Sequence, residues 1–477
     1  MSSANNAHES KLYAEREPVF PRRVRGQFRT LKWWIMGVTL GIYYLTPWIR
    51  WDRGPNLPDQ AVLLDLAHRR FFFFMIEIWP HEFYFVAGLL IMAGLGLFLF
   101  TSALGRVWCG YTCPQTVWTD LYVLVERWIE GDRNARVRLW HQNWDLRKLR
   151  LRLFKWAVWL LIAVATGGAW VFYFTDAPAL ARELVTLEAP AIAYLTIATL
   201  TATTFLFGGF FREQICIYAC PWPRIQAAMM DAETLTVAYR DWRGEPRGKH
   251  RKAEGADQLG DCVDCMACVN VCPMGIDIRD GQQLACITCA LCIDACDEIM
   301  VKLDKPTGLI GYLALSDETR ERIGQEPKVI WRHILRPRTV LYTTLWSTVG
   351  ILLVMALFLR QEIGLTVAPI RNPTFVTLSD GSVRNTYDLR LRNMNLDDRV
   401  FHLSLSSDAL LRISLEGVED LTVRVPANEM MLQRVYVTAA PDSPAAATHS
   451  TNLRFWVEDL QSTDRASKDT VFNGRGE

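Results

Sequence analysis

Two closely spaced cysteine runs constrain the fold of this chain more than any other feature of its sequence. The first run, Cys262–Cys272, has the spacing C-x2-C-x2-C-x3-C, and the second run, Cys286–Cys296, repeats it. In bacterial proteins with two [4Fe–4S] clusters, this spacing places three cysteines on one cluster and the fourth on the other. We therefore predict one cluster on Cys262, Cys265, Cys268 and Cys296, and a second on Cys286, Cys289, Cys292 and Cys272.

A pair of structural zinc sites is the main alternative, because zinc also binds C-x2-C pairs. Zinc takes its four thiolates from two separate pairs, whereas three cysteines in succession at this spacing suit an iron–sulfur cube. One departure from the usual pattern is that Asp297, rather than proline, follows Cys296. That proline shapes the loop and is no ligand, so we retain the iron–sulfur assignment.

Composition indicates a membrane protein with soluble parts. Half of the residues are hydrophobic and 22% are charged, and the two kinds fall in separate long blocks. The formal net charge is only +1, so no overall field favours nucleic acid as a partner. None of the 12 cysteines follows Cys296, and clustered free thiols need a reducing compartment. We therefore expect the iron–sulfur domain to be cytoplasmic.

Five apolar segments are long enough to cross a bilayer, whose core needs about 20 helical residues. The polar residues 1–30 do not lead into a cleavage site, so the first segment is expected to remain as a span. A sixth apolar run, Phe71–Trp79, is too short and contains Glu77, and we expect an interfacial or re-entrant segment there. The expected spans are Leu31–Trp48, Phe83–Leu104, Leu153–Phe174, Ala189–Phe211 and Thr339–Leu359.

Basic residues between the spans predict the orientation, because loops rich in lysine and arginine stay in the cytoplasm. Several basic residues, from Arg22 to Lys32, lie before and at the start of the first span, and many more lie in the loop from Arg127 to Lys155. The loop Asp176–Glu188, in contrast, has one arginine and three acids. Four arginines between Arg50 and Arg70 oppose this orientation but are outnumbered. We predict a cytoplasmic N-terminus and ferredoxin domain, with the C-terminal domain across the membrane.

The basic segment Arg133–Lys155 also contains Trp140 and Trp144, a mixture that is found in nucleic-acid-binding patches as well. Because the segment adjoins an expected span, we interpret it as lying on anionic lipid headgroups. The segment Arg240–Lys252 contains glycines and a proline, and we interpret it as a basic linker that sets the topology and contacts lipid. Membrane lipid is thus an expected partner of both segments.

After Glu362 the pattern changes to short segments in which apolar and polar residues alternate, as in half-buried strands. About seven such strands in roughly 110 residues are typical of an immunoglobulin-like sandwich. The region has no cluster of cysteine or histidine, so we expect it to contact a partner or to cap the chain. The clearest strands are predicted at Thr386–Asn393, Arg399–Ser406, Leu421–Val425 and Leu432–Thr438.

A second cysteine pattern is duplicated next to the membrane. The motif C-x-x-x-C-P at Cys109–Pro114 follows the second span, and it recurs 107 positions later at Cys216–Pro221, after the fourth. In a helix, both sulfurs of a motif would share one face, and the proline would open or kink a helix. Four soft thiolates would bind Cu(I), zinc or an iron–sulfur cluster, whereas the alternative is simple packing of cysteines at helix ends. The candidate catalytic and metal-binding residues are Cys109, Cys113, Cys216 and Cys220.

These features predict a multi-domain membrane protein with an α-helical bundle of about five transmembrane helices, an inserted α+β dicluster ferredoxin domain and a C-terminal all-β immunoglobulin-like sandwich. The expected parts are a cytoplasmic tail at 1–30, a membrane domain with four spans and both C-x-x-x-C-P motifs at 31–238, a cytoplasmic ferredoxin domain at 239–335, a fifth span at 336–362 and a periplasmic domain at 363–477.

The combined motifs resemble the CcoG/FixG/RdxA family of cytochrome oxidase accessory proteins. The likeness is carried by Gly260–Cys265, Gly275–Gly281 and Cys292–Asp297 in the ferredoxin region and by Tyr239–Lys249 upstream. It covers nearly the whole chain, from the spans to the immunoglobulin-like domain. The cysteine runs alone are shared by many proteins, whereas their combination with the duplicated membrane motif is far more specific.

The resemblance implies a cupric reductase of the bacterial inner membrane that supports assembly of cbb3-type cytochrome c oxidase. Such a protein would take electrons from a cytoplasmic donor and reduce Cu(II) to Cu(I), with oxidase subunits or copper chaperones as partners and a homodimer left open. Iron–sulfur clusters carry one electron at a time, which matches the reduction of copper. Thiolates favour the Cu(I) product, and the hypothesis places copper on Cys109, Cys113, Cys216 and Cys220.

Two other functions fit the sequence. The first is a membrane ferredoxin that passes electrons between a cytoplasmic donor and quinone or a periplasmic reductase, as in related nitrate and nitrous oxide accessory proteins with C-x-x-x-C-P motifs. The second is a non-enzymatic scaffold for oxidase assembly with structural clusters. Haem or flavin also stays open. Candidate ligands of haem or copper are His68, His81 and His333, although lone histidines near interfaces are more often packed or hydrogen-bonded.

Overall fold

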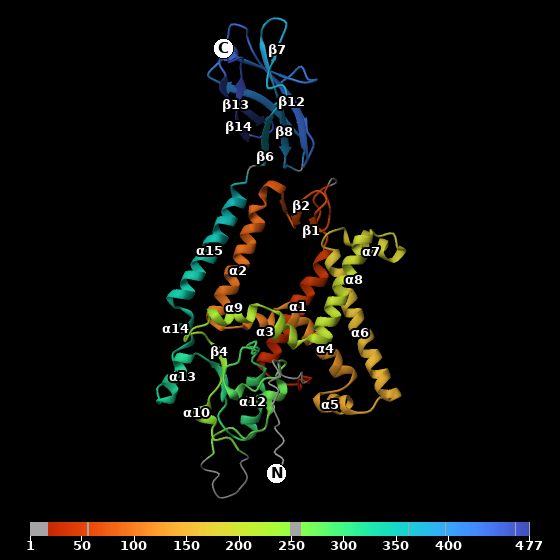
Figure 1. Ribbon diagram of the computed structural model, residues 1–477, viewed down its shortest axis with the longest axis vertical. Helices are drawn as coiled ribbons and strands as arrows, with labels where there is room; N and C mark the ends of the chain where they lie inside the picture. Colours follow the sequence, from red (N-terminus) through yellow and green to blue (C-terminus); the bar gives the residue numbers. More distant parts are fainter. Residues whose placement is uncertain are drawn as a thin grey trace, which may run out of the picture. The chain divides into compact units, whose positions relative to one another are not determined.

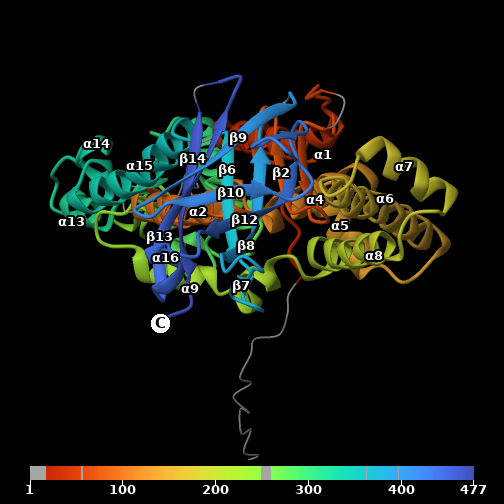
Figure 2. The same ribbon diagram turned by 90° about the horizontal axis from the view of Figure 1, so that it is seen from above.

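The computed structural model describes residues 18–54, 57–248, 259–360, 362–395, 397–462 and 464–476. The chain divides into two compact units, the first formed by Met1–Ile49 and Gln60–Ile351 and the second by Arg50–Asp59 and Leu352–Glu477. The first unit contains the long helices and the ferredoxin region, and the second is built mainly of strands (Figure 1 and Figure 2). The part of the predicted basic linker at 249–252 lies outside the described residues.

Four helices in the described residues are long and apolar enough to cross a membrane, and they match the second to fifth predicted spans. Most of their apolar side chains are not buried by other parts of the protein. In the most apolar stretch of Pro80–Leu104 only 11% of the residues are buried, and in that of Pro337–Phe358 none is. Such surfaces require lipid rather than water. The four segments are Pro80–Leu104, which contains α2 (Tyr84–Leu104), then α6 (Leu146–Val171), Ala191–Phe211, which contains α8 (Ala191–Leu206), and α15 (Pro337–Phe358).

The helices α6 and α8 pack closely because small residues face one another. A side chain at Gly167 of α6 would lie only 2.8 Å from the carbonyl oxygen of Ile197 in α8. The hydroxyl of Thr201 donates to the carbonyl oxygen of Ala163 at 3.4 Å. Small residues and hydroxyl groups are the usual means by which membrane helices approach each other. Figure 1 and Figure 2 show the two helices side by side.

The first predicted span forms a helix that does not reach the apolar character of the four candidate membrane spans over 18 consecutive residues. Helix α1 (Gln27–Leu45) has 19 residues, but it is not among the four apolar helices. Its first turns contain Arg29 and Lys32, and both side chains are buried. The backbone N–H of Arg29 donates to the carboxylate of Asp294 in the ferredoxin region at 2.7 Å. The polar start of α1 thus contacts the ferredoxin region, and the apolar part of the helix follows it.

The segment Phe71–Trp79 forms strands and not a re-entrant segment, while its interfacial position stays a prediction. It contributes β2 (Arg70–Phe73) and β3 (Ile76–Ile78) to a three-stranded antiparallel sheet with β1 (Val62–Asp65). Glu77 of β3 forms an ion pair with Arg70 of β2 at 3.3 Å, so its charge needs no interfacial position. The re-entrant alternative was wrong because a short apolar run has no periodicity that separates a strand from a membrane segment.

The ferredoxin region is a small α+β domain within the first unit. Strands β4 (Thr236–Tyr239) and β5 (Ile310–Leu313) pair antiparallel on either side of the two cysteine runs. Helix α11 (Ala267–Val271) lies within the first run, and α12 (Leu291–Lys302) covers the end of the second. This arrangement confirms the predicted α+β class of the domain.

The second unit contains nine strands in the described residues, compared with about seven predicted from the sequence. The four clearest predictions correspond to β8 (Val383–Asn393), β9 (Arg399–Ser407), β11 (Thr422–Val425) and β12 (Met430–Ala439). The other strands are β6 (Ile363–Pro369), β7 (Val376–Thr377), β10 (Leu411–Leu415), β13 (Ser450–Asp459) and β14 (Arg465–Asn473).

These strands form a sandwich of two antiparallel sheets. One sheet has the order β10-β12-β8-β6, with β7 paired to β8, and the other has the order β11-β9-β13-β14. Alternate side chains of each sheet enter a common core, where the rings of Tyr387 and Phe455 lie 5.2 Å apart and are fully buried. The two-sheet core confirms the predicted immunoglobulin-like class.

Replacement of Phe455 by alanine should destabilise the sandwich by about 3–5 kcal/mol, because it leaves a cavity between the two sheets. In the full-length protein, limited proteolysis of the C-terminal strands should accelerate while the iron content stays unchanged, since the two units are separate. Leu432→Ala on β12 is the control, because this side chain is 57% exposed. A loss of iron in Phe455→Ala would contradict the independence of the units.

Candidate functional site

Two small cavities lie inside the ferredoxin domain, and each is lined by cysteines from both runs. The first is lined by Cys262, Cys265, Cys268 and Cys296. The second is lined by Cys272, Cys286, Cys289 and Cys292, with Cys268 at its edge. Apart from the cysteines, the walls are mainly aliphatic. Each cavity thus takes three cysteines from one run and a further cysteine from the other, as the spacing predicts for two crossed clusters.

The backbone around the two cavities adopts the same rare conformation at equivalent positions. Asp264 and Thr288 have φ values of 50° and 53°, and Met266 and Ala290 have values of 58° and 59°. Both pairs are 24 positions apart, which is also the offset between the two cysteine runs. Left-handed backbone costs about 1–2 kcal/mol per non-glycine residue, so the surrounding structure must hold these loops in shape. Strain of this kind concentrates at binding sites.

Arg279 places a positive charge at the wall of the first cavity. Its guanidinium donates to the carboxylates of Asp277 and Asp264, each at 2.6 Å. Burial raises the pKa of Cys268 to about 11, while the charge of Arg279 acts to lower it. The protonated thiol must therefore lose its proton when it binds iron. Arg279 is not among the residues predicted from the sequence, although its position between Asp277 and Asp280, shortly after a cysteine run, was an available signal.

The first membrane motif is divided between two helices. Cys109 lies in α3 (Val107–Tyr111), whereas Cys113 precedes α4 (Pro114–Ile129). Pro114 is the first residue of α4, so the proline opens a helix, where its missing N–H is not needed. The backbone leaves the helical conformation at Cys113, with φ of −58° and ψ of 128°. The two sulfurs therefore do not share the face of one continuous helix.

The second membrane motif begins in a π-helical segment and ends just before an α-helix. A π-helical segment, η3 (Phe207–Phe211), precedes it, and Cys216 lies in a second such segment, η4 (Ile215–Ala219). Cys220 follows in extended backbone, after which α9 (Trp222–Met229) begins. π-helical turns are rare and frequently occur at functional sites.

The four thiols of the two motifs lie near one another. Cys216 interacts electrostatically with Cys113, Cys109 and Cys220, and Cys109 interacts with Cys113 and Cys220. Burial raises the pKa of Cys216 to about 12 and also raises that of Cys109. At neutral pH these two thiols carry protons that a metal must displace. In the described part of the chain, no three His, Cys, Asp or Glu side chains converge as ligands of a single metal ion.

The first motif is docked directly on the loop of the second cysteine run. A side chain at Gly110 would lie 2.6 Å from the carbonyl oxygen of Ile287 and 3.0 Å from the Cα of Cys289, so only glycine fits there. The hydroxyl of Tyr111 donates to the carbonyl oxygen of Cys289 at 3.2 Å. The membrane thiol of Cys109 is therefore held beside the loop that lines the second cavity.

Arg106 adds a buried cation to this contact. Its backbone N–H donates to the hydroxyl of Thr288 at 3.3 Å, and its guanidinium donates to the carbonyl oxygen of Leu284. The side chain is only 2% exposed. Burial raises the pKa of both Cys109 and Cys286, and the charge of Arg106 acts to lower both. One cation therefore influences a membrane thiol and a thiol of the second cavity.

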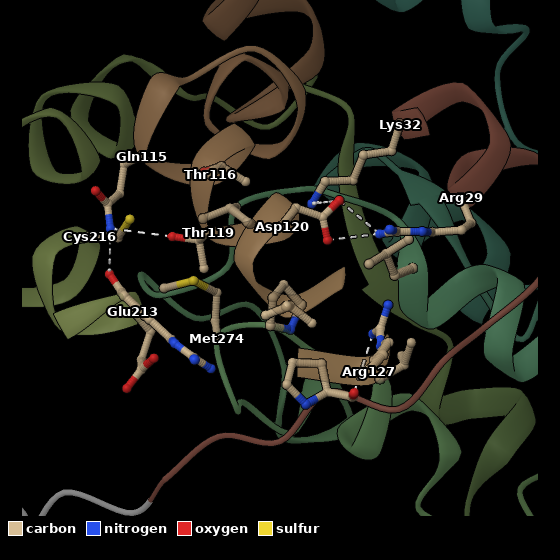
Figure 3. A pocket seen from close by; sticks show the side chains of 17 residues that line it. Arg29, Lys32, Gln115, Thr116, Thr119, Asp120, Arg127, Glu213, Cys216 and Met274 are labelled. Carbon is tan, nitrogen blue, oxygen red and sulfur yellow. Dashed lines mark hydrogen bonds and ion pairs between the residues drawn. The ribbon is translucent and has the colours of Figure 1, made fainter. Parts of the chain in front are cut away.

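Two glutamines connect the two membrane motifs. The thiol of Cys109 donates to the Oε1 atom of Gln226 in α9 at 3.1 Å, and Gln226 is 1% exposed. Gln115, in the first turn of α4, donates to the carbonyl oxygen of Arg212 at 3.2 Å. Gln115 and Cys216 line the same cleft (Figure 3). Each motif is thus hydrogen-bonded to the chain segment that contains the other.

A buried ion cluster joins α1 to the helix that follows the first motif. Asp120 of α4 pairs with Arg29 at 2.9 Å and with Lys32 at 3.9 Å (Figure 3). Burial acts to raise the pKa of Asp120, but the charges of Lys32 and Arg29 outweigh it and hold the pKa below its usual value. The cluster lines a narrow cleft that also reaches Cys216.

The three candidate histidines are paired with carboxylates. Both ring nitrogens of the buried His333 are engaged, Nδ1 with Glu233 at 2.8 Å and Nε2 with Asp317 at 2.6 Å. His68 and His81 each lie beside a carboxylate of their own segment. These contacts favour hydrogen-bonding roles for the histidines over ligation of haem or copper.

Comparison with known protein families identifies three parts of the chain. Residues 211–315 match a 4Fe-4S dicluster domain, and residues 85–132 match a 4Fe-4S binding domain. Residues 353–475 match the IG-like fold at the C-terminus of FixG. The first range contains both cysteine runs and the second membrane motif, and the second range contains the first membrane motif. These matches support iron–sulfur clusters as cofactors and agree with the two-sheet fold of the second unit.

The chain is 71% identical to protein RdxB of Cereibacter sphaeroides over 469 residues, which covers 98% of both chains. It is 66% identical to protein RdxA of the same organism, over 94% of this chain and 95% of RdxA. It is 53% identical to the nitrogen fixation protein FixG of Rhizobium meliloti, over 97% and 94%. A crystal structure of a FixG-related protein from Vibrio parahaemolyticus covers 24% of this chain and 99% of its own, with 22% identity and a TM-score of 0.21. The full-length relatives show that this chain belongs to the FixG/RdxA family.

Proposed function

We propose that this protein is a membrane-bound reductase that transfers single electrons from a cytoplasmic donor to Cu(II), forming Cu(I) for the assembly of cbb3-type cytochrome c oxidase. The observation that carries the proposal is the contact between the first membrane motif and the loop of the second cysteine run. This contact supports the proposal, because it holds the thiol of Cys109 beside the cysteine loop that we propose binds a cluster, within one compact unit. A one-electron donor next to soft metal ligands is what the reduction of copper requires.

Eight cysteines are proposed to hold two [4Fe–4S] clusters. The cavities fit such groups, because each offers four thiols in a mainly aliphatic lining and lies within loops whose strained backbone is repeated. When bound, the clusters supply one-electron transfer between the donor and the membrane thiols. The proposed ligands are Cys262, Cys265, Cys268 and Cys296 for one cluster and Cys272, Cys286, Cys289 and Cys292 for the other.

The residues around Gly110 are proposed to position the two sites for electron transfer. Gly110 allows the two backbones to touch, and Tyr111 fixes their register through the carbonyl of Cys289. Arg106 supplies a buried positive charge beside both sites. An added electron makes either site more negative, and a fixed cation in a medium of low dielectric stabilises that charge.

Copper is the proposed substrate of the four membrane thiols. Burial raises the pKa of Cys109 and Cys216, so these two thiols stay protonated until the metal arrives, and binding of Cu(II) releases their protons to water. Thiolate ligands then bind Cu(I) more strongly than Cu(II), which makes the free energy of copper reduction more favourable at this site. Each Cu(II) consumes one electron from the cytoplasmic donor. The proposed ligands are Cys109, Cys113, Cys216 and Cys220.

The proposed topology places the ferredoxin domain in the cytoplasm and the C-terminal domain in the periplasm of the bacterial inner membrane. The basic segments before α1 and between α2 and α6 support this orientation. It requires α1 to cross as a fifth span, and 19 helical residues extend about 28 Å against a bilayer core of about 30 Å. The immunoglobulin-like domain would then meet oxidase subunits or copper chaperones outside the cytoplasm.

A second role for the membrane thiols is favoured by two observations. These thiols lie near one another, as the ferredoxin cysteines do. Neither set, among the described residues, is arranged as the ligands of a single metal ion. The segment 85–132, which contains Cys109 and Cys113, also matches a 4Fe-4S binding domain. On this reading the four thiols hold a further iron–sulfur cluster, and copper or quinone accepts electrons elsewhere.

Gly110→Ala should slow the oxidation of the reduced protein by Cu(II) about tenfold or more, because a methyl group here overlaps the backbone of Ile287 and displaces the motif. Stopped-flow spectroscopy of the purified protein after reduction with dithionite measures this rate. Gly94→Ala in α2 is the matched control, since its added methyl group meets nothing within 4 Å. A wild-type rate in Gly110→Ala with full iron content would remove the contact from the electron path.

Replacement of all four membrane cysteines by serine should abolish both copper binding and Cu(II) reduction. The two ferredoxin clusters should remain, with about eight iron atoms per chain in the variant and in the wild type. Iron analysis, copper titration and Cu(II) turnover of the same preparations make the comparison. Unchanged turnover would remove these cysteines from the copper site.

The same measurements separate the alternatives. About twelve iron atoms in the wild type and about eight in the four-serine variant would assign a third cluster to the membrane thiols. Rapid oxidation of the reduced protein by quinone without copper would favour a membrane ferredoxin. Reduction of the clusters without turnover of any acceptor would favour an assembly scaffold.

A further inference from the structure

A cavity of about 500 Å³ lies at the polar end of α6. It is bounded by α4, α6, η3 and the coil before α1, and the proposed electron transfer makes no use of it. Its volume is within the range of small-molecule sites, about 300–1,000 Å³. The lining residues that matter for its chemistry are Trp140, Trp144, Lys148, Arg152, Lys155 and Arg212.

One face of α6 directs basic side chains into this cavity instead of toward solvent. Lys148, Arg152 and Lys155 lie at helical positions i, i+4 and i+7, and their exposed fractions are 5%, 8% and 2%. On the outer face of the same turns, Arg147 and Arg150 are exposed. Burial of charge is costly unless an opposite charge compensates it. The buried basic face therefore needs anions.

Two carboxylates, Glu126 in α4 and Glu130 at its C-terminal end, compensate part of this charge. Glu126 accepts ion pairs from Arg136 at 2.7 Å and from Arg212 at 2.6 Å. Glu130 pairs with Lys155 at 2.9 Å, and it lies 3.1 Å from the nearest guanidinium nitrogen of Arg152. Burial acts to raise the pKa of Glu126, but the surrounding cations hold it at about 2, so this carboxylate is ionised.

The basic residues nevertheless outnumber the acids. Among the described residues that line the cavity, four are cations and two, Glu126 and Glu213, are acids. Lys148 is the cation without a carboxylate in ion-pair distance among the described residues, because its ammonium donates to the carbonyl oxygens of Trp140 and Gln142. It also lies 5.1 Å from the ring of Trp144. A net charge of about +2 in a largely buried cavity requires an external anion.

The mouth of the cavity lies at the level expected for lipid headgroups. Trp140 and Trp144 stand at the mouth with exposed fractions of 49% and 66%, and tryptophan is enriched at the interface between membrane and water. The apolar turns of α6 begin directly beyond Lys155. An amphiphile in the cavity would therefore place its anionic group among the cations and its chains along α6.

We propose that this cavity binds the phosphate headgroup of an anionic phospholipid, with Lys148 and Arg152 as its main contacts. A neutral ligand such as quinone would leave the excess positive charge uncompensated, and a lipid without net charge would compensate it less well. Arg212 and Glu213 line both this cavity and the cleft at Cys216. A lipid in the cavity would therefore lie next to the segment that leads into the second membrane motif.

Native mass spectrometry of the full-length protein in detergent tests the site with phosphatidylglycerol, phosphatidylcholine and inorganic phosphate as probes. The wild type should retain one phosphatidylglycerol at concentrations at which phosphatidylcholine is lost. Lys148→Gln should weaken the binding of phosphatidylglycerol about fivefold, the effect of one basic residue near a lipid surface. Arg147→Gln is the matched control, because it removes the same charge one position away on the exposed face and should leave binding unchanged.

Equal retention of both lipids by the wild type would overturn the proposal without reference to any variant. So would an equal loss of binding in Lys148→Gln and Arg147→Gln, or displacement of phosphatidylglycerol by millimolar inorganic phosphate, which would assign the cavity to a free anion. Iron content and Cu(II) reduction, measured on the same preparations, show whether the variants are folded. A negative result at this cavity leaves the proposed reductase function untouched, since the site contributes no thiol or cluster ligand.

Discussion

The approach of two backbones at Gly110 is the interaction on which the rest of the site depends. A hydrogen atom in place of a side chain lets α3 touch the carbonyl oxygen of Ile287 and the Cα of Cys289. A contact between backbones cannot be adjusted by rotamer changes, so it sets the separation of the membrane thiols and the second cavity. Tyr111 and Arg106 hold the register of this contact, and the strained loops around the cavities hold its other side.

Helix α4 is the element that keeps this contact in place from behind. Three carboxylates in this helix or at its C-terminal end attract cations from different elements: Asp120 from α1, Glu126 from the basic segment and from Arg212 just after η3, and Glu130 from α6. Buried ion pairs add little net stability because of desolvation, but removal of one partner is costly. Their effect is therefore to specify one arrangement of these elements. The proline of the first motif opens this same helix, so the thiols and the ion pairs share one scaffold.

Local features of the sequence predicted much of this protein. Four apolar runs became the four apolar helices, and four alternating segments became β8, β9, β11 and β12. The prediction failed at Phe71–Trp79, where an ion pair across two strands compensates the charge of Glu77. The basic residues at the start of α1 were visible in the sequence, but their pairing with Asp120 through Arg29 and Lys32 was not. In both places the environment of a charged side chain depends on a partner that is distant in sequence or lies on the neighbouring strand. Hydrophobic periodicity cannot reveal such a partner.

The sequence by itself determined the iron–sulfur pattern, the apolar helices, the sandwich and the duplicated membrane motif, because spacing and hydrophobic period act over a few residues. Only the tertiary structure decided that the first motif rests on the second cysteine run, since Tyr111 and Cys289 are 178 positions apart. It also decided that Lys148 faces a cavity while its neighbour Arg147 faces outward. Both outcomes depend on which surfaces pack together, and chain packing brings together residues that share no local pattern.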